Sequence, residues 1–76
     1  MVEFRVKINS IDEVKKFVGI VAKYEFDVDI ISDKYSVNAK SVMGIFSIDL
    51  SNELVMKAHT NDEETVKADL TDYIVA

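Results

Sequence analysis

The chain has 76 residues, of which 49% are hydrophobic and 30% are charged, and this composition predicts a single globular domain over residues 1–76. Fourteen acidic residues against nine basic ones give a formal net charge of -5, which opposes binding to nucleic acid. The chain has no cysteine and one histidine, which excludes disulfides, thiol nucleophiles and multi-histidine metal sites, so we expect no metal and no cofactor.

Three further classes are excluded by length and hydropathy. No apolar run approaches the roughly 18 residues that cross a bilayer, and no secretory signal opens the sequence, so we expect a cytoplasmic protein without a membrane partner. A domain of this size has no room for a deep active-site cavity. We therefore expect a protein that binds or carries rather than an enzyme.

The first elements in chain order are a strand and a helix. Residues 2–8 alternate apolar and charged side chains, which is typical of a strand with one buried face. Ser10 and Glu13 form an S-x-x-E capping box at the start of a helix. Gly19 within it indicates either close packing or a tolerated weakness. The apolar residues of this helix recur at helical spacing at Val14, Phe17, Val18 and Val21.

The middle of the chain predicts two strands and a short helix. Alternation returns in residues 27–30 and again in residues 35–39, with a turn over residues 32–34. Ser41 is a good N-cap for a helix that follows it. Gly44 limits that helix to about two turns.

The last part of the chain predicts a fourth strand and a third helix. The strand covers residues 54–59, and Thr60 or Asn61 caps the helix after it. The buried stripe of this helix is predicted at Val66, Leu70, Tyr73 and Ile74. The order β-α-β-β-α-β-α, with alternating strands, predicts an α+β open-faced sandwich: a mainly antiparallel sheet with helices on one face and water on the other.

Few polar side chains in this pattern point to chemistry. Ser10 lies where a helix N-terminus favours an anion, but a plain N-cap role explains it better. His59 could accept a phosphoryl group or act as a general base, although the local sequence places no carboxylate beside it. Asp27 and Asp29 share one strand face, where solvation accounts for them.

Residues 40–48 are the strongest candidate for an interaction surface, because they hold more apolar side chains than a short helix buries easily. Exposed methionine and aromatic side chains are typical of protein docking sites. The alternative, in which all of the apolar residues belong to the core, stays open. The predicted docking residues are Lys40, Val42, Met43, Ile45, Phe46 and Ile48.

The segment 37–45, Val-Asn-Ala-Lys-Ser-Val-Met-Gly-Ile, resembles the surroundings of the regulatory serine in HPr, the phosphocarrier of the bacterial phosphotransferase system. The similarity continues through residues 18–30 and 61–63. This resemblance implies a four-stranded antiparallel sheet in which the fourth strand lies between the first and the second, under three helices. It also implies that an HPr kinase/phosphorylase phosphorylates Ser41 and that the adjacent helix then binds a transcriptional regulator.

The segment 8–13 departs from the HPr pattern. The family carries its phosphoryl group on a histidine beside an arginine, whereas Ser10 stands at the histidine position here and Asp12 and Glu13 replace arginine and proline. A serine hydroxyl of ordinary pKa is a poor acceptor, and carboxylates repel an incoming phosphoryl group. The resemblance therefore implies a histidine-less regulatory or adaptor protein. Two alternatives stay open: an HPr-fold binding module unrelated to sugar uptake, and a divergent phosphocarrier that uses Ser10 or His59.

Overall fold

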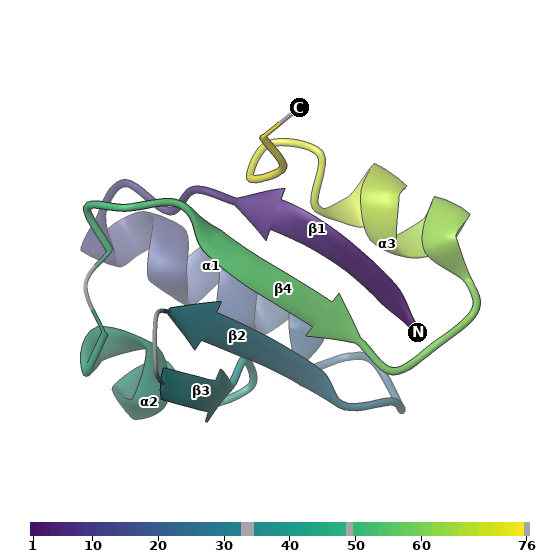
Figure 1. Ribbon diagram of the computed structural model, residues 1–76, viewed down its shortest axis with the longest axis horizontal. Helices are drawn as coiled ribbons and strands as arrows, with labels where there is room; N and C mark the ends of the chain where they lie inside the picture. The colour runs from purple at the N-terminus through teal and green to yellow at the C-terminus, as the bar shows by residue number, and fades with distance from the viewer. Residues whose placement is uncertain (33–34, 49, 76) are drawn as a thin grey trace.

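The computed structural model describes residues 1–32, 35–48 and 50–75, which form a four-stranded sheet and three helices (Figure 1). The element order is the predicted one: β1 (Val2–Val6), α1 (Ile11–Val21), β2 (Val28–Ser32), β3 (Tyr35–Asn38), α2 (Val42–Phe46), β4 (Leu54–Ala58) and α3 (Glu63–Asp69). Within the described ranges, no helix has the length and hydropathy that a membrane span requires. The predicted turn over residues 32–34 lies mostly outside the described residues.

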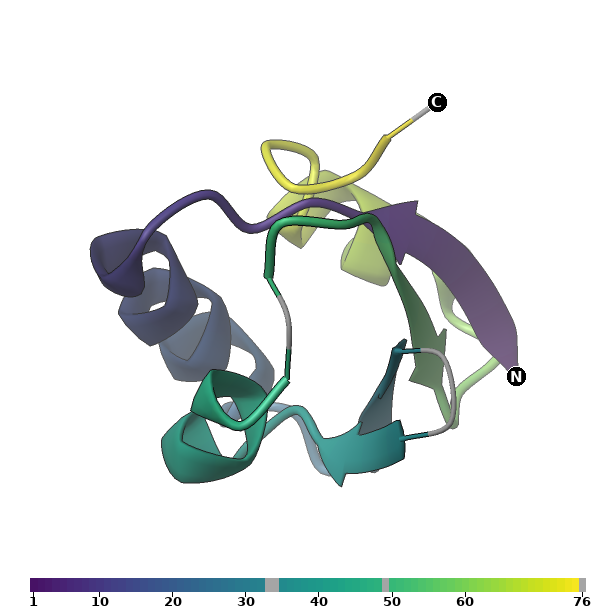
Figure 2. The same cartoon turned by 60° about the vertical axis from the view of Figure 1, so that its left-hand side comes forward.

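The sheet is antiparallel throughout, in the order β1-β4-β2-β3. Met56, in the centre of β4, lies opposite Phe4 of β1 on one side and Ile30 of β2 on the other. This arrangement confirms the strand order that the resemblance implied. Figure 2 shows α1 and α2 together on one side of the sheet, so that its other side faces solvent, as the alternating strands predicted.

The core lies between the sheet and α1. The apolar positions predicted for α1 are all buried, and they meet the buried residues Leu54, Met56 and Ala58, which alternate along β4. The rings of Phe17 and Tyr73 pack edge to face, with centroids 5.4 Å apart. Gly19 lies on the exposed side of α1 with no neighbouring atom near its missing Cβ, so it is a tolerated weakness rather than a close contact.

The cap predicted for the last helix was wrong. Asp62, rather than Thr60 or Asn61, is the N-cap of α3, and its Oδ1 accepts a hydrogen bond from the Thr65 N–H at 3.3 Å. The Thr60 hydroxyl instead accepts from the Asp62 N–H at 3.1 Å. Thr60 therefore stabilises the turn before the helix, which leaves the cap position to Asp62.

The prediction that the last helix includes Tyr73 and Ile74 was also wrong. The helix ends at Asp69, and the chain then turns back to the outer edge of β1, where Ile74 forms a β-bridge with Val6. The Lys7 N–H donates to the Tyr73 carbonyl at 2.8 Å. β1 ends at Val6 because its pairing partner β4 begins at Leu54, although the alternation continues to Ile8, which is buried.

Candidate functional site

The N-terminus of α1 is built around Ser10. This exposed residue has an extended backbone, and its Oγ accepts a hydrogen bond from the Glu13 N–H at 3.2 Å. Asp12 and Glu13 give the first turn two carboxylates, which complement the positive end of the helix dipole. Burial and then Glu13 raise the pKa of the Tyr73 phenol. The chemistry of this end is therefore that of an acidic helix cap without an imidazole or a guanidinium.

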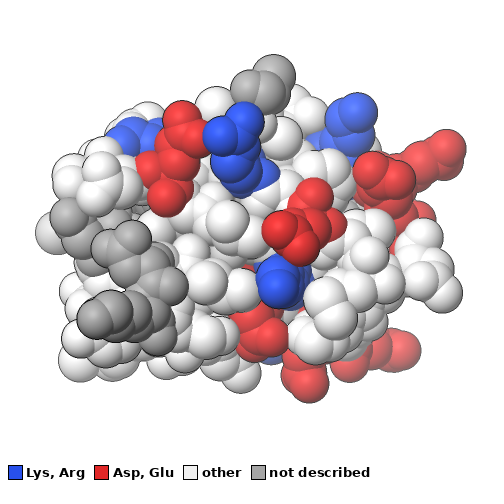
Figure 3. Space-filling view, viewed as in Figure 1, with Lys and Arg blue, Asp and Glu red and all other residues white. Residues whose placement is uncertain are grey.

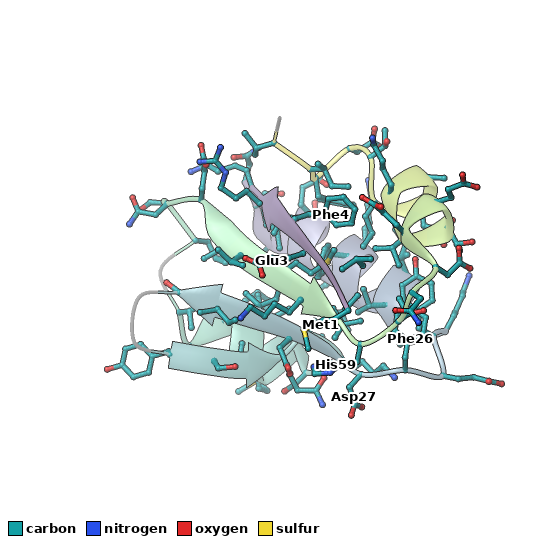
Figure 4. The ribbon with its side chains drawn as sticks, turned by 45° about the vertical axis from the view of Figure 1, so that its right-hand side comes forward. Met1, Glu3, Phe4, Phe26, Asp27 and His59 are labelled. Carbon is teal, nitrogen blue, oxygen red and sulfur yellow. The ribbon has the colours of Figure 1, made fainter. Side chains whose placement is uncertain are left out.

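His59 follows β4 and pairs with a carboxylate that sequence analysis did not assign to it. Its Nε2 lies 2.8 Å from Oδ2 of Asp29, on the neighbouring strand β2, and both side chains are partly exposed. The His59 N–H also donates to the Asp27 carbonyl at 2.9 Å. Figure 4 shows His59 and Asp27 near Met1. The signal for this pair was present in the shared face of Asp27 and Asp29, but it required the β2–β4 register to be recognised.

Ser10 and His59 lie at opposite ends of the sheet. Because β1 and β4 are antiparallel, Ala58 lies opposite Val2, so His59 adjoins the beginning of β1. Ser10 comes after the end of β1. The two residues that the phosphocarrier alternative named therefore do not form one site.

Ser41 caps α2, as predicted. Its Oγ accepts from the Gly44 N–H at 3.1 Å, and its own N–H donates to the Asn38 carbonyl at 3.0 Å. A Cβ added at Gly44 would lie 3.2 Å from the Ser41 Oγ and 3.4 Å from the Val37 Cβ. Glycine therefore allows the first turn of α2 to approach both the serine and the end of β3. The Ser41 side chain is half-buried, so part of it meets solvent.

The predicted docking residues divide between the core and the surface. Met43 is 78% exposed and Phe46 39% exposed, while Val42 is partly buried against the core. Ile45 and Ile48 are buried, so their assignment to a docking surface was wrong. A helix of five residues presents only one side to solvent; Ile45 lies on the other side, and Ile48 enters the core after the helix has ended. We call the exposed pair, Met43 and Phe46, the α2 face.

Lys40 is committed to the interior side of the loop rather than to Ser41. Its Nζ donates to the Tyr24 carbonyl at 2.8 Å, and its N–H donates to Oδ1 of Asn38 at 2.8 Å. One of the three N–H donors of the Lys40 ammonium group is therefore used within the fold, and its docking role stays a prediction. Its observed role is to hold the loop before α2 against the end of α1.

Tyr24 joins three parts of the fold, and sequence analysis did not identify it. Its hydroxyl donates to Oδ2 of Asp69 at 2.7 Å, and its ring stacks on Phe26 with centroids 4.7 Å apart. Burial, and then Asp69, raise the pKa of this phenol. A shallow hollow beside it is lined by Ile20, Lys23, Tyr24 and Asp69. Nothing in the local sequence pairs residues that lie this far apart in the chain.

The grouping of potential metal ligands can be examined in the described part of the chain. Among residues 1–32, 35–48 and 50–75, no three histidine or carboxylate side chains converge on one point. The His59–Asp29 pair supplies two such groups, which is fewer than a protein-held metal ion usually takes.

Comparison with known proteins decides the family. The family model described as the PTS HPr component phosphorylation site matches residues 12–76. The chain belongs to the HPr family. Members of this family are phosphocarriers rather than enzymes, and they interact with other proteins of the phosphotransferase system or with regulators. The matched residues include Ser41 and α2, whereas Ser10 precedes them.

Solved structures of HPr proteins share the fold. HPr-C-His from Thermoanaerobacter tengcongensis is 30% identical, with a TM-score of 0.80 over 95% of this chain and 89% of that one. The phosphocarrier protein HPr from Bacillus anthracis is 26% identical, with a TM-score of 0.73 over 97% and 96%. The catabolite repression protein Crh of Bacillus subtilis is 25% identical, with a TM-score of 0.64 over 93% and 88%. No curated protein sequence matches the chain significantly.

Proposed function

We propose that this chain is a regulatory or adaptor HPr protein that acts through Ser41 and the α2 face and does not carry out histidine phosphotransfer. In this proposal it works in the cytoplasm, where a kinase with access to ATP modifies Ser41. Its partners are an HPr kinase/phosphorylase and a protein such as a transcriptional regulator. The observation that carries the proposal is the position of Ser41, which is half-buried at the N-terminus of α2 and lies close in sequence to the exposed Met43 and Phe46.

Phosphorylation of Ser41 requires little rearrangement. The Oγ–P bond forms as the bond from the γ-phosphorus to its bridging oxygen breaks, ADP leaves, and the hydroxyl proton passes to a base of the kinase. A phosphoserine keeps an oxygen acceptor near the Gly44 N–H that Ser41 now caps. The added negative charge then lies beside the α2 face, where a partner can recognise both together.

The N-terminus of α1 supports the second part of the proposal. Ser10 caps the helix at the place where the resemblance puts the phosphoaccepting histidine, and Asp12 follows it on the exposed side. A hydroxyl without an adjacent general base is a weak nucleophile, and a carboxylate repels a phosphoryl donor. His59 is an unsuitable substitute because it lies at the other end of the sheet.

The similarity to Crh favours the regulatory interpretation over a carrier. That protein is named for catabolite repression, and it shares this fold over nearly the whole of both chains. By analogy, the present chain uses its HPr fold for recognition rather than for sugar uptake.

Intact mass spectrometry tests the proposal directly. The chain is incubated with ATP and an HPr kinase/phosphorylase, and in parallel with phosphoenolpyruvate and enzyme I. We expect one added phosphoryl group in the first reaction and none in the second. Ser41→Ala abolishes the addition, whereas Ser47→Ala, which removes a second exposed serine at the end of α2, leaves it unchanged.

Two results would overturn the proposal. Phosphate transfer from enzyme I that disappears in Ser10→Ala or His59→Ala establishes a divergent phosphocarrier. A folded chain that takes up no phosphate in either reaction is an HPr-fold binding module outside sugar uptake.

A further inference from the structure

The two edge strands of the sheet differ in whether their outer main-chain groups have hydrogen-bond partners. On the outer side of β1, the Lys7 N–H donates to the Tyr73 carbonyl and the Val75 N–H donates to the Arg5 carbonyl, each at 2.8 Å. At the other edge, β3 pairs with β2 alone among the described residues. An unpaired strand edge presents N–H and C=O groups that can bind another strand. Within the described ranges, the chain thus covers the end of one edge and leaves the β3 edge without a second strand.

The β3 strand has none of the features that usually protect such an edge. Its sequence, Tyr-Ser-Val-Asn, contains no charged residue and no proline. Tyr35 at its beginning is 68% exposed. Natural edge strands commonly carry lysine or proline to prevent pairing with other chains, and β1 carries Glu3 and Arg5. The β3 edge is therefore suited to pairing.

The α2 face lies along the same margin of the molecule as β3. Only Ala39, Lys40 and Ser41 separate the two elements, and Figure 2 shows them side by side at the bottom of the view. Figure 1 also shows α2 close to β3. One partner that approached this margin would meet both the open edge and the exposed Met43 and Phe46.

The distribution of charge identifies a suitable partner. Residues 35–48 contain no acidic residue and one basic residue, Lys40, in a chain whose net charge is -5. Figure 3 shows acidic side chains at the end of the molecule that carries α3, on the right of the view, and further ones along the lower margin and at the upper left. Two copies of an acidic protein repel each other over most of their surfaces, whereas β3 and the α2 face bring no carboxylate of their own to such a contact.

We infer that two copies of this chain associate through β3, antiparallel about a twofold axis, so that the two four-stranded sheets become continuous. The same axis brings the α2 face of each copy against that of the other. Main-chain hydrogen bonds then satisfy the open edges, and burial of Met43 and Phe46 adds apolar contact area. If the proposed function holds, this dimer competes with the regulatory partner for the α2 face.

Sedimentation equilibrium of the full chain over a concentration series tests the inference. We expect the mass to rise from that of one 8.6 kDa chain toward that of two. Tyr35→Glu and Met43→Glu each place a carboxylate in the interface twice and raise the dissociation constant about tenfold or more. Ile11→Glu is the matched control, because Ile11 is 61% exposed but lies at the start of α1, and it leaves the dissociation constant unchanged.

The inference fails if the chain remains monomeric up to a concentration of about 1 mM, because an association weaker than that does not indicate a specific interface. It also fails if Ile11→Glu separates the copies as effectively as Met43→Glu, or if assembly continues beyond a dimer. Circular dichroism establishes that each variant is folded. Because the assay contains neither kinase nor nucleotide, its failure is distinct from a failure of Ser41 phosphorylation.

Discussion

Gly19 and Gly44 both lie in helices, yet their surroundings predict different results for alanine. At Gly19 an added methyl group meets no atom within 4 Å, so only the helix preference changes. We expect Gly19→Ala to raise the free energy of unfolding by about 1 kcal/mol. Urea denaturation measures this gain, and an unchanged or lowered midpoint would contradict it.

Gly44→Ala is the corresponding change where space is limited. The new Cβ would lie 3.2 Å from the Ser41 Oγ, which must move although it caps the helix. We expect the loss of packing and of the cap, worth about 1 kcal/mol, to cancel the gain in helix preference. Denaturation of Gly44→Ala in the Ser41→Ala background checks the cause, because the penalty is smaller once the hydroxyl is absent.

The raised pKa of Tyr24 predicts that the free energy of unfolding decreases in alkaline solution. Its pKa is raised in the folded protein by burial and by Asp69, so the unfolded chain loses this proton first as the pH rises. The stabilising contribution is complete below the unfolded pKa of about 10 and decreases above it. Tyr24→Phe keeps the ring that stacks on Phe26 but removes the phenol proton. We expect this variant to lose less stability than the parent chain between about pH 9 and about pH 11.5, a range that brackets the ordinary tyrosine pKa. Identical slopes for the two proteins would exclude this assignment.

At the scale of the element, α2 has one side that stabilises the fold and one that is available for binding. Ile45 is fully buried, so Ile45→Ala should lower the free energy of unfolding by about 2–5 kcal/mol. Met43→Ala, on the exposed side, should change it by less than about 0.5 kcal/mol while weakening the binding of a partner. Thermal unfolding and a binding titration on the same samples distinguish the two roles. If α2 were wholly structural, Met43→Ala would lower the stability as well as the binding.

The elements with a clear period were predictable from sequence, and those with an ambiguous period were not. The apolar stripe of α1 and the alternation in β4 specify one buried face each, and both were correct. A helical spacing continues through Val66, Leu70, Tyr73 and Ile74, yet the helix itself ends at Asp69. It ends there because the segment beyond Leu70 is held by hydrogen bonds to β1. Local spacing does not contain that tertiary constraint.

The candidate site shows the same limit. The caps at Ser10 and Ser41 follow from short-range hydrogen-bonding rules and were predicted. The direction in which a five-residue helix faces does not follow from its own sequence, which is why Ile45 was assigned to the surface, and Ile48 was assigned there because the path of the chain after the helix was unknown. The Tyr24–Asp69 and His59–Asp29 contacts join residues distant in the chain, so they required the fold to be known.

At the scale of the whole molecule, phosphorylation and association should be coupled. Ser41 lies between β3 and α2, so two phosphoserines in the inferred dimer would place like charges near the same axis. We expect the phosphorylated chain to dissociate about tenfold more readily than the unmodified one. Sedimentation before and after treatment with the kinase measures the difference, and equal dissociation constants would show that the two events are independent.

The return of residues 73–75 to the edge of β1 limits how far such association can proceed. A sheet with two free edges can add a molecule at each end and grow without termination into a filament. In this chain the segment 73–75 already occupies the Arg5–Lys7 end of the β1 edge, so a further copy cannot pair along the whole of that edge, whereas the β3 edge is used once in the inferred dimer. If copies associate as inferred, residues 73–75 thereby help to stop growth at the dimer, although they lie outside every helix and named strand.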